Sequence, residues 1–246
     1  MDEYQQLLKQ ASQALAEGSW KTAIALATEA TKLRPDLVQA LLLHAGALMD
    51  GGMFTDALEI FDRAEEINPD DPTIVTNRGI CMFELCRFDS AEGILEFALE
   101  LDNRMAGAHH YLGLLMERKG DWLDANKHLA RAHKLDPETF SLPVPIDDEE
   151  FSSLVESSMM KLPTTTIRDL DKVTIDIQLL PDEQKLTSYE PPLSPQILGL
   201  GMTDVDTKLK SIVLYQRNLQ RIATDKADME KQIRMTILYE LRAQPD

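Results

Sequence analysis

The stretch GSWKTAIALATEATKLRP, residues 18–35, returns in outline every 34 residues and decides the fold of the first half of the chain. The returning features are an aromatic residue (Trp20, Phe54, Phe88, Trp122), two alanines (Ala23, Ala57, Ala91, Ala125, then Ala30, Ala64, Ala98, Ala132) and a closing tripeptide (Leu33-Arg34-Pro35, Ile67-Asn68-Pro69, Leu101-Asp102-Asn103, Leu135-Asp136-Pro137). A fixed period with small, aromatic and proline positions predicts stacked helical hairpins. Such an array offers a surface for another chain, so we expect binding rather than catalysis.

The period divides residues 1–139 into one solenoid domain of consecutive hairpins, set as residues 4–37, 38–71, 72–105 and 106–139. Three copies place a glycine two residues before the aromatic (Gly18, Gly52, Gly120), and the third copy has Cys86 there. Glycine ends a helix readily because it adopts the left-handed backbone conformation at little cost. Position eight of each copy is small (Ala11, Ala45, Gly79, Gly113), as expected where two helices cross closely.

These positions resemble the tetratricopeptide repeat, and the resemblance extends over residues 4–139. It implies that positions two, five, nine and twelve of each first helix line a concave groove that holds a peptide. Those positions hold Gln5, Leu8, Ser12, Leu15; Gln39, Leu42, Gly46, Met49; Thr73, Thr76, Ile80, Phe83; and Gly107, His110, Leu114, Glu117. We expect partner contacts from Leu8, Leu42, Met49, Ile80, Phe83, His110 and Leu114.

The groove positions are apolar or weakly polar. Members of the family that clamp a terminal carboxylate use Lys, Arg and Asn there, and this chain has no such basic set, which argues against that ligand. The trough favours an amphipathic helix or the chain's own second domain. For Leu8 and Leu42, packing against neighbouring helices is an equally good interpretation.

The chain of 246 residues carries a formal net charge of −17, spread over both halves. Nucleic-acid binding relies on clustered Lys and Arg, so we exclude it. No apolar run approaches the roughly 18 residues that suggest a membrane span, and a chain that begins with Asp2-Glu3 lacks the basic and apolar start of a secretory signal. We therefore expect a cytoplasmic protein that binds no membrane.

Metal and cofactor sites are not expected in the repeats. Cys81 and Cys86 do not share a helix face, so they do not form a metal site. Both are expected to be buried, reduced thiols, as is usual in a cytosolic protein. His109 and His110 point about 100° apart on a helix, and neither has a carboxylate or histidine three or four residues further along.

A short, stiff linker with Pro143 and Pro145 spans residues 140–146. In the rest of the chain, residues 147–246, the hydrophobic pattern predicts a helix, a strand, a proline-rich loop, a second strand and a final helix. The residues behind these predictions are the stripe Phe151, Leu154, Val155, Met159 and Leu162; the strand face Val173, Ile175 and Ile177; the strand 211–215; and the seam Met229, Ile233, Ile237 and Leu241. The first helix is a candidate cap for the last repeat.

This order of elements resembles a small bacterial family of zincin-like metallopeptidases, and the resemblance covers residues 147–246. The segments that carry it are Glu150-Phe151 with Leu162-Pro163, Leu180-Pro181-Asp182, Pro191-Pro192-Leu193-Ser194-Pro195 and Leu214-Tyr215-Gln216-Arg217-Asn218. It implies a small α+β domain whose last helix carries His-Glu-x-x-His, with two histidines on zinc and the glutamate as general base.

The motif position reads Tyr239-Glu240-Leu241-Arg242-Ala243, so Glu240 alone matches the family. Alanine cannot bind zinc, a neutral tyrosine is a poor ligand, and no histidine follows His133. The sequence therefore predicts a degenerate domain with a vestigial Glu240, lost ligands at Tyr239 and Ala243, no metal and no peptidase activity.

These observations predict a bacterial, non-catalytic adaptor that binds a protein or peptide in its repeat groove without a cofactor, and they leave self-association open. Two alternatives remain. One is an active metallopeptidase with non-standard ligands around Glu240. The other is a repeat-type chaperone of a secreted or apolar partner.

Overall fold

The computed structural model describes residues 2–164, 166, 170, 173–203 and 209–242. The chain divides into two compact units, Met1–Phe140 and Ser141–Asp246, which we call the repeat unit and the sheet unit. Within the part of the chain that is described, no helix combines the length and apolarity needed to cross a membrane.

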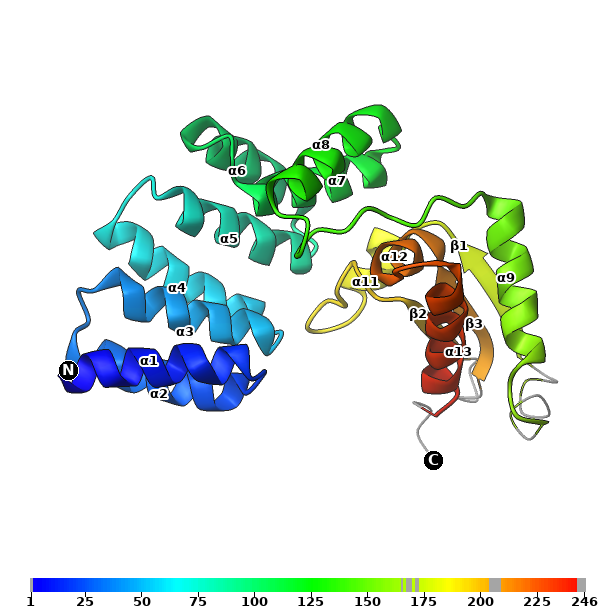
Figure 1. Cartoon of the computed structure of the whole chain (residues 1–246), viewed down its shortest axis with the longest axis horizontal. Coiled ribbons are helices and arrows are strands. Elements are labelled where there is room, and N and C mark those ends of the chain that lie inside the picture. The colour runs from blue at the N-terminus through cyan, green and yellow to red at the C-terminus, as the bar shows by residue number, and fades with distance from the viewer. Residues whose placement is uncertain (1, 165, 167–169, 171–172, 204–208, 243–246) are drawn as a thin grey trace. The chain divides into compact units, whose positions relative to one another are not determined.

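The repeat unit consists of helices that pair into consecutive hairpins (Figure 1). The helices are α1 (Glu3–Ala16), α2 (Trp20–Leu33), α3 (Val38–Asp50), α4 (Phe54–Ile67), α5 (Pro72–Glu84), α6 (Phe88–Leu101), α7 (Ala106–Lys119) and α8 (Trp122–Leu135). The second helix of each hairpin begins at the repeat's aromatic residue and ends at the first residue of the closing tripeptide. The predicted helical-hairpin solenoid is therefore confirmed.

The turn inside each hairpin places one residue in the left-handed backbone region. Gly18, Gly52 and Gly120 have φ angles of 70°, 73° and 78°, and Cys86 has 57°. A residue with a side chain pays about 1–2 kcal/mol in this conformation, so the third hairpin bears a strain that glycine avoids in the others. Cys86 and Cys81 are both buried, as the sequence predicted.

The small residues at position eight allow the two helices of a hairpin to approach closely. Ala11 and Ala45 are fully buried. A Cβ atom added to Gly79 would lie 2.6 Å from the Cγ of Leu95, and one added to Gly113 would lie 2.8 Å from the Cγ of Leu129. Both glycines are therefore required by packing, since real Cβ contacts are not this short.

The sheet unit contains, among its described residues, a three-stranded sheet in the order β1-β3-β2 (Figure 1). The central strand β3 (Leu209–Tyr215) pairs in parallel with β1 (Thr174–Gln178) and antiparallel with β2 (Gly199–Thr203). Ile212 and Leu214 of β3 are fully buried. The two strands predicted from the sequence are present, whereas β2 was not predicted because glycine disfavours strands.

The helices α9 (Asp148–Met160), α12 (Gln216–Ile222) and α13 (Lys226–Arg242) form one core with this sheet. The short helix α11 (Glu183–Thr187) lies between β1 and β2 in the chain. Phe151 and Val155 of α9 lie in the same buried cluster as Met229 and Ile233 of α13. The α9 stripe that we considered as a cap for the repeats is thus part of the sheet unit's own core. Ile177, expected on the inner strand face, is 37% exposed.

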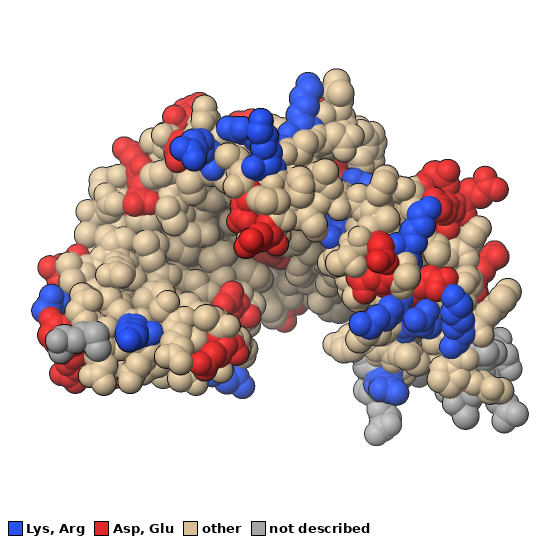
Figure 2. All heavy atoms as spheres, viewed as in Figure 1, with Lys and Arg blue, Asp and Glu red and all other residues tan. Residues whose placement is uncertain are grey.

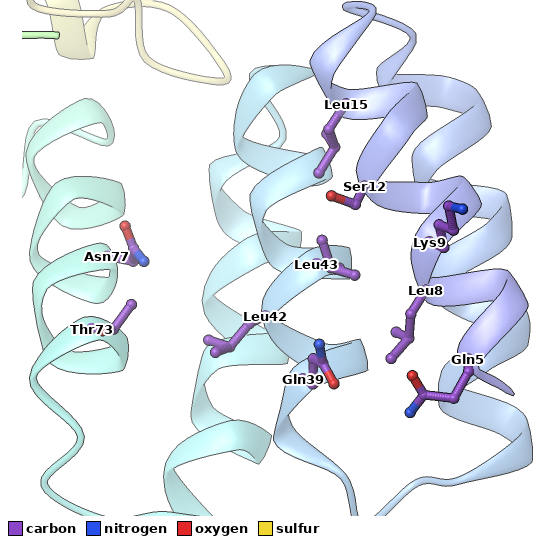
Figure 3. A pocket seen from close by; sticks show the side chains of 10 residues that line it. All are labelled: Gln5, Leu8, Lys9, Ser12, Leu15, Gln39, Leu42, Leu43, Thr73 and Asn77. Atoms are coloured by element: carbon purple, nitrogen blue, oxygen red, sulfur yellow. The ribbon is translucent and has the colours of Figure 1, made fainter. Parts of the chain in front are cut away.

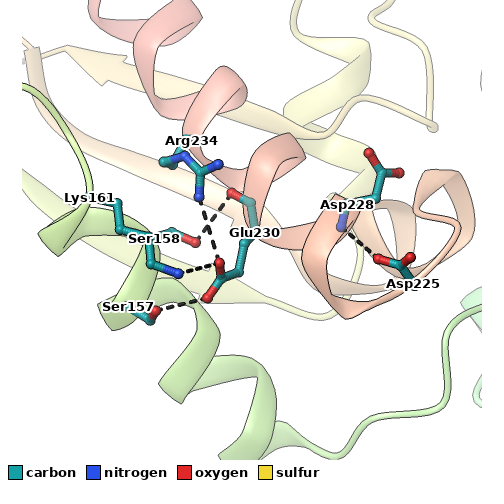
Figure 4. Close-up of polar contacts among 7 residues, drawn as sticks. All are labelled: Ser157, Ser158, Lys161, Asp225, Asp228, Glu230 and Arg234. Carbon is teal, nitrogen blue, oxygen red and sulfur yellow. Dashed lines mark hydrogen bonds and ion pairs between the residues drawn. The ribbon is translucent and has the colours of Figure 1, made fainter.

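Polar contacts tie α9 to α13 (Figure 4). The Glu230 carboxylate accepts a hydrogen bond from Ser157 Oγ at 2.8 Å and pairs with Lys161 Nζ at 2.5 Å, and these contacts lower the pKa of Glu230. At the start of α13, Asp225 accepts the backbone N–H of Asp228 at 2.8 Å. The carboxylate at this helix start also complements the helix dipole. The helix that carries the motif position is thereby held in place.

Candidate functional site

A groove of about 670 Å³ opens on the repeat unit between α1, α3 and α5 (Figure 3). Its lining residues are Gln5, Leu8, Lys9, Ser12, Leu15, Gln39, Leu42, Leu43, Thr73 and Asn77. Figure 3 shows these side chains projecting from the three first helices of successive repeats. The groove therefore lies on the surface where the repeat resemblance places a peptide site.

The lining combines leucines with neutral polar groups. Leu8 is 4% exposed, whereas Gln39 and Thr73 are exposed. Lys9 is the one charged residue among the ten, and Figure 2 shows a mostly uncharged surface along this face of the repeat unit. Apolar floors with a few amide and hydroxyl groups suit ligands that bury aliphatic side chains and hydrogen-bond through their backbone.

The residues predicted to contact a partner are not all gathered in this groove. Leu8 and Leu42 line it. Met49, Ile80 and His110 are half-buried outside its lining, and the ring of His110 lies 4.7 Å from that of Phe140.

Two of the predicted contact residues belong to the core instead. Phe83 and Leu114 are each 2% exposed. The ring of Phe83 packs edge-on against Phe88 and Tyr111, with centroids 5.4 and 5.1 Å apart. Both side chains belong to one buried hydrophobic cluster, so we remove them from the proposed partner surface.

Lys9, Leu43 and Asn77 line the groove but were not predicted from the sequence. All three occupy position six of their repeats, which is four residues after position two. Residues four apart lie on the same helix face, so positions two, five, six and nine form one stripe. The helical period could have identified this position from the sequence.

The sheet unit has a second cavity, of about 350 Å³, beside the motif position on α13. It is lined by Ile197, Leu198, Gly199, Gln232, Met235, Thr236, Tyr239 and Glu240. The Glu240 carboxylate accepts the backbone N–H of Gly201 on β2 at 2.8 Å. Burial raises the pKa of Glu240, and the hydrogen bond from Gly201 opposes that rise. The carboxylate thus contacts the strand β2.

The residues at the motif position do not fit a zinc ion. Tyr239 is 69% exposed, and Ala243 lies outside the described residues. All five histidines precede residue 141, and the described residues hold no group of three His, Cys, Asp or Glu side chains suited to a metal. Zinc sites of this class need imidazole or carboxylate ligands that converge on the ion, and this arrangement is missing around Glu240 in the part of the chain described.

The segment Leu214–Asn218, which carries part of the family resemblance, has a structural role. Asn218 is 2% exposed and donates hydrogen bonds to the carbonyls of Pro195 and Ile197 at 3.0 and 2.6 Å. Burial raises the pKa of Tyr215 to about 12. Asn218 therefore anchors the end of the proline-rich loop and the adjoining Ile197, which lines the cavity.

Two protein-family models match parts of the chain. Residues 14–76 match the model of the tetratricopeptide repeat family, and residues 170–244 match that of the zincin-like metallopeptidases. Both resemblances drawn from the sequence are thereby confirmed.

Individual proteins are similar to part of the chain. It is 28% identical over 118 residues to Protein CTR9 homolog of Arabidopsis thaliana and 30% identical over 126 residues to the BBSome complex member BBS4 of Bos taurus. These matches cover 48% and 51% of this chain but only 11% and 24% of the two relatives. Among solved structures, MamA from Desulfovibrio magneticus RS-1 is 20% identical with a TM-score of 0.48, over 56% of this chain and 78% of that chain.

Proposed function

We propose that this chain, which joins a tetratricopeptide repeat region to a zincin-like domain, is a non-catalytic adaptor that binds a protein segment in its repeat groove. The observation that carries the proposal is the lining of the groove, where four leucines lie among neutral polar side chains. An aliphatic group of a ligand that is buried on these leucines contributes about 25 cal/mol of favourable free energy for each Å² of apolar surface removed from water.

The expected ligand is a short amphipathic segment, helical or extended. Its apolar side chains would cover the leucines, and the amides of Gln5, Gln39 and Asn77 can donate to and accept from its polar groups. A segment that ends in a clamped carboxylate is not expected, since Lys9 is the one cation of the lining. The net charge of −17 supports a protein partner over a nucleic acid.

Substitutions in and away from the groove test the proposal. Leu42→Asp places a carboxylate on the apolar floor, and Gln39→Arg places a bulky cation at an exposed groove position. Leu123→Asp is the matched control, because Leu123 is 70% exposed and does not line the groove. Affinity capture with the full chain and quantitative mass spectrometry should show the same partners lost with both groove variants and kept by the control.

Folding of the variants is checked by thermal unfolding, since Leu42 also packs against the core of the second repeat. Gln39 has no such packing role, so Gln39→Arg keeps the test informative if Leu42→Asp unfolds. Retention of every partner by a folded Gln39→Arg and Leu42→Asp would reject the groove as the binding surface.

The zincin-like domain, in this proposal, has lost peptidase activity. The contact from Glu240 to the Gly201 N–H, the exposed Tyr239 and a donor set without histidine support this. Incubating the purified chain with Zn²⁺ and a peptide library tests it. Cleavage that disappears in Glu240→Gln would instead establish a metallopeptidase with non-standard ligands.

We further place the adaptor in a bacterial cytoplasm. Two buried cysteines outside any disulfide support a reducing compartment, and the bacterial origin follows from the resemblance of the second domain. Cell fractionation with an antibody to the chain is the direct test, and recovery in a secreted fraction would contradict it.

A further inference from the structure

Two histidines of the last repeat face each other across its hairpin. His109 of α7 and His128 of α8 bring their Nδ1 atoms to 3.1 Å, with ring centroids 5.2 Å apart and ring planes inclined by 44°. They are 19 residues apart in the chain, and both are half-buried, so solvent reaches the pair. Neither histidine belongs to the groove or to the cavity of the sheet unit.

The tautomer of His109 follows from its second contact. Its Nε2 lies 3.2 Å from the backbone carbonyl of Asn103. A carbonyl only accepts, so Nε2 carries the proton and Nδ1 presents its lone pair towards His128. Histidines that bind metals usually donate their other ring N–H to a carbonyl or carboxylate in this way.

The separation of the two nitrogens suits a shared ion. Metal–nitrogen bonds of about 2.0–2.1 Å and angles of roughly 90–109° place two neighbouring nitrogen ligands about 2.8–3.4 Å apart. We propose that His109 and His128 form a two-imidazole site for a borderline divalent cation such as Zn²⁺, which bridges α7 and α8 and completes its coordination with water.

The surroundings keep both rings available as ligands. Desolvation lowers the pKa of His109 and of His128, with the charges of Arg131 and Lys127 acting in the same direction on the respective rings. The hydrogen bond to the Asn103 carbonyl acts in the opposite sense on His109, and the charges of Asp124 and Glu96 do so on His128. Ligating histidines must be neutral, and a lowered pKa favours the neutral form of both rings.

The site should bind more weakly than a closed structural zinc site. The described residues offer no third His, Cys, Asp or Glu to make a larger group, so water supplies the remaining ligands. Imidazole nitrogens nevertheless discriminate Zn²⁺, Ni²⁺ and Cu²⁺ from Mg²⁺ and Ca²⁺, which prefer oxygen. Cys81 does not compete as a ligand, because burial raises its pKa to about 12 and keeps the thiol protonated.

A bound ion would stabilise the last hairpin. A ligand that binds only the folded state raises stability in proportion to the logarithm of its concentration over its Kd. The ion would join two helices whose contact otherwise depends on packing, so the repeat unit should unfold at a higher temperature when Zn²⁺ is present.

Calorimetric titration of ZnCl₂ into the tag-free full chain, with Mg²⁺ in excess to occupy oxygen-only sites, tests the proposal. We expect one saturable site in the wild type and in His110→Gln, the matched control on the neighbouring residue. His109→Gln and His128→Gln should each weaken binding by at least about tenfold, the smallest loss typical of even the outer partners of metal ligands. Zn²⁺ should raise the unfolding temperature of wild type and control but not of these two variants.

A measurement on the unmodified chain guards against variants that fail to fold. Imidazole ¹⁵N spectra should show the Nδ1 resonances of two histidines shifting together as Zn²⁺ is added. Equal Zn²⁺ affinity in His128→Gln and wild type would show that the ion binds elsewhere. If no saturable Zn²⁺ binding were seen, the two histidines would form only a neutral N–H···N hydrogen bond. Either result overturns the proposal.

Discussion

Gly79 offers a direct test of the packing argument for the repeats, through substitution by alanine. Gly79 lies inside α5, and an added Cβ would lie 2.6 Å from the Cγ and 2.7 Å from the Cδ2 of Leu95. Leu95 is fully buried, so it has little room to move. Overpacking of this kind costs about 1–3 kcal/mol, whereas replacing a helical glycine by alanine gains about 1 kcal/mol.

Gly93 is the matched control because it lies in α6 of the same hairpin, and an added Cβ there would meet no atom within 4 Å. Gly93→Ala should therefore stabilise the repeat unit by about 1 kcal/mol through helix propensity alone. The propensity gain is common to both substitutions, so Gly79→Ala should be less stable than Gly93→Ala by roughly 1–3 kcal/mol, the cost of the overlap.

Urea unfolding followed by tryptophan emission measures this difference in the full chain. The two tryptophans, Trp20 and Trp122, both lie in the repeat unit, so the signal reports the unfolding of that unit. A change of midpoint at constant slope gives the change in the free energy of unfolding. If the two alanine variants were equally stable, the reasoning that helix crossing dictates glycine at position eight would be refuted.

Three further substitutions have defined outcomes. Gly120→Ala should destabilise the repeat unit by about 1–2 kcal/mol in urea, because Gly120 has a φ of 78° while its surroundings leave room for a methyl group. His44 has a pKa below its usual 6.5, owing to burial and to the charge of Arg63, so the unfolded state takes up a proton first as pH falls. The wild type should therefore lose stability relative to His44→Gln as pH is lowered from about 7 to 5, in unfolding curves recorded by tryptophan emission at each pH. Asn218→Ala should cost about 1–3 kcal/mol, because the carbonyls of Pro195 and Ile197 lose their buried donor; circular dichroism at increasing temperature would record the loss, and an unchanged transition would contradict the anchoring role.

The helices of the repeat unit could be predicted closely because one constraint repeats along the chain. The aromatic that opens each second helix and the tripeptide that closes it recur with the 34-residue period, and the observed bounds follow them. The groove could be predicted in part, because the helical period gives the helix face on which a residue lies but not how deeply its side chain is buried. Phe83 and Leu114 lie at groove positions, yet both belong to the buried core.

The remaining features depend on contacts between distant segments. β2 contains Gly199 and Gly201, which local propensity assigns to a loop, and it becomes a strand through its pairing with β3. His109 has no ligand partner among its neighbours along α7, whereas its ring meets His128 of the next helix. The repeat register places the two helices side by side, so this pairing depends on contacts across the hairpin.

The hydrogen bond between Glu240 and Gly201 also bears on the solubility of the sheet unit. β2 is an edge strand, and an unpaired edge is a template on which strands of other molecules can assemble. The Gly201 N–H is already held by the Glu240 carboxylate at 2.8 Å. A strand that approached this point would have to displace the half-buried Glu240 carboxylate. The glutamate that matches the family's general base therefore protects this point of the sheet edge against intermolecular pairing.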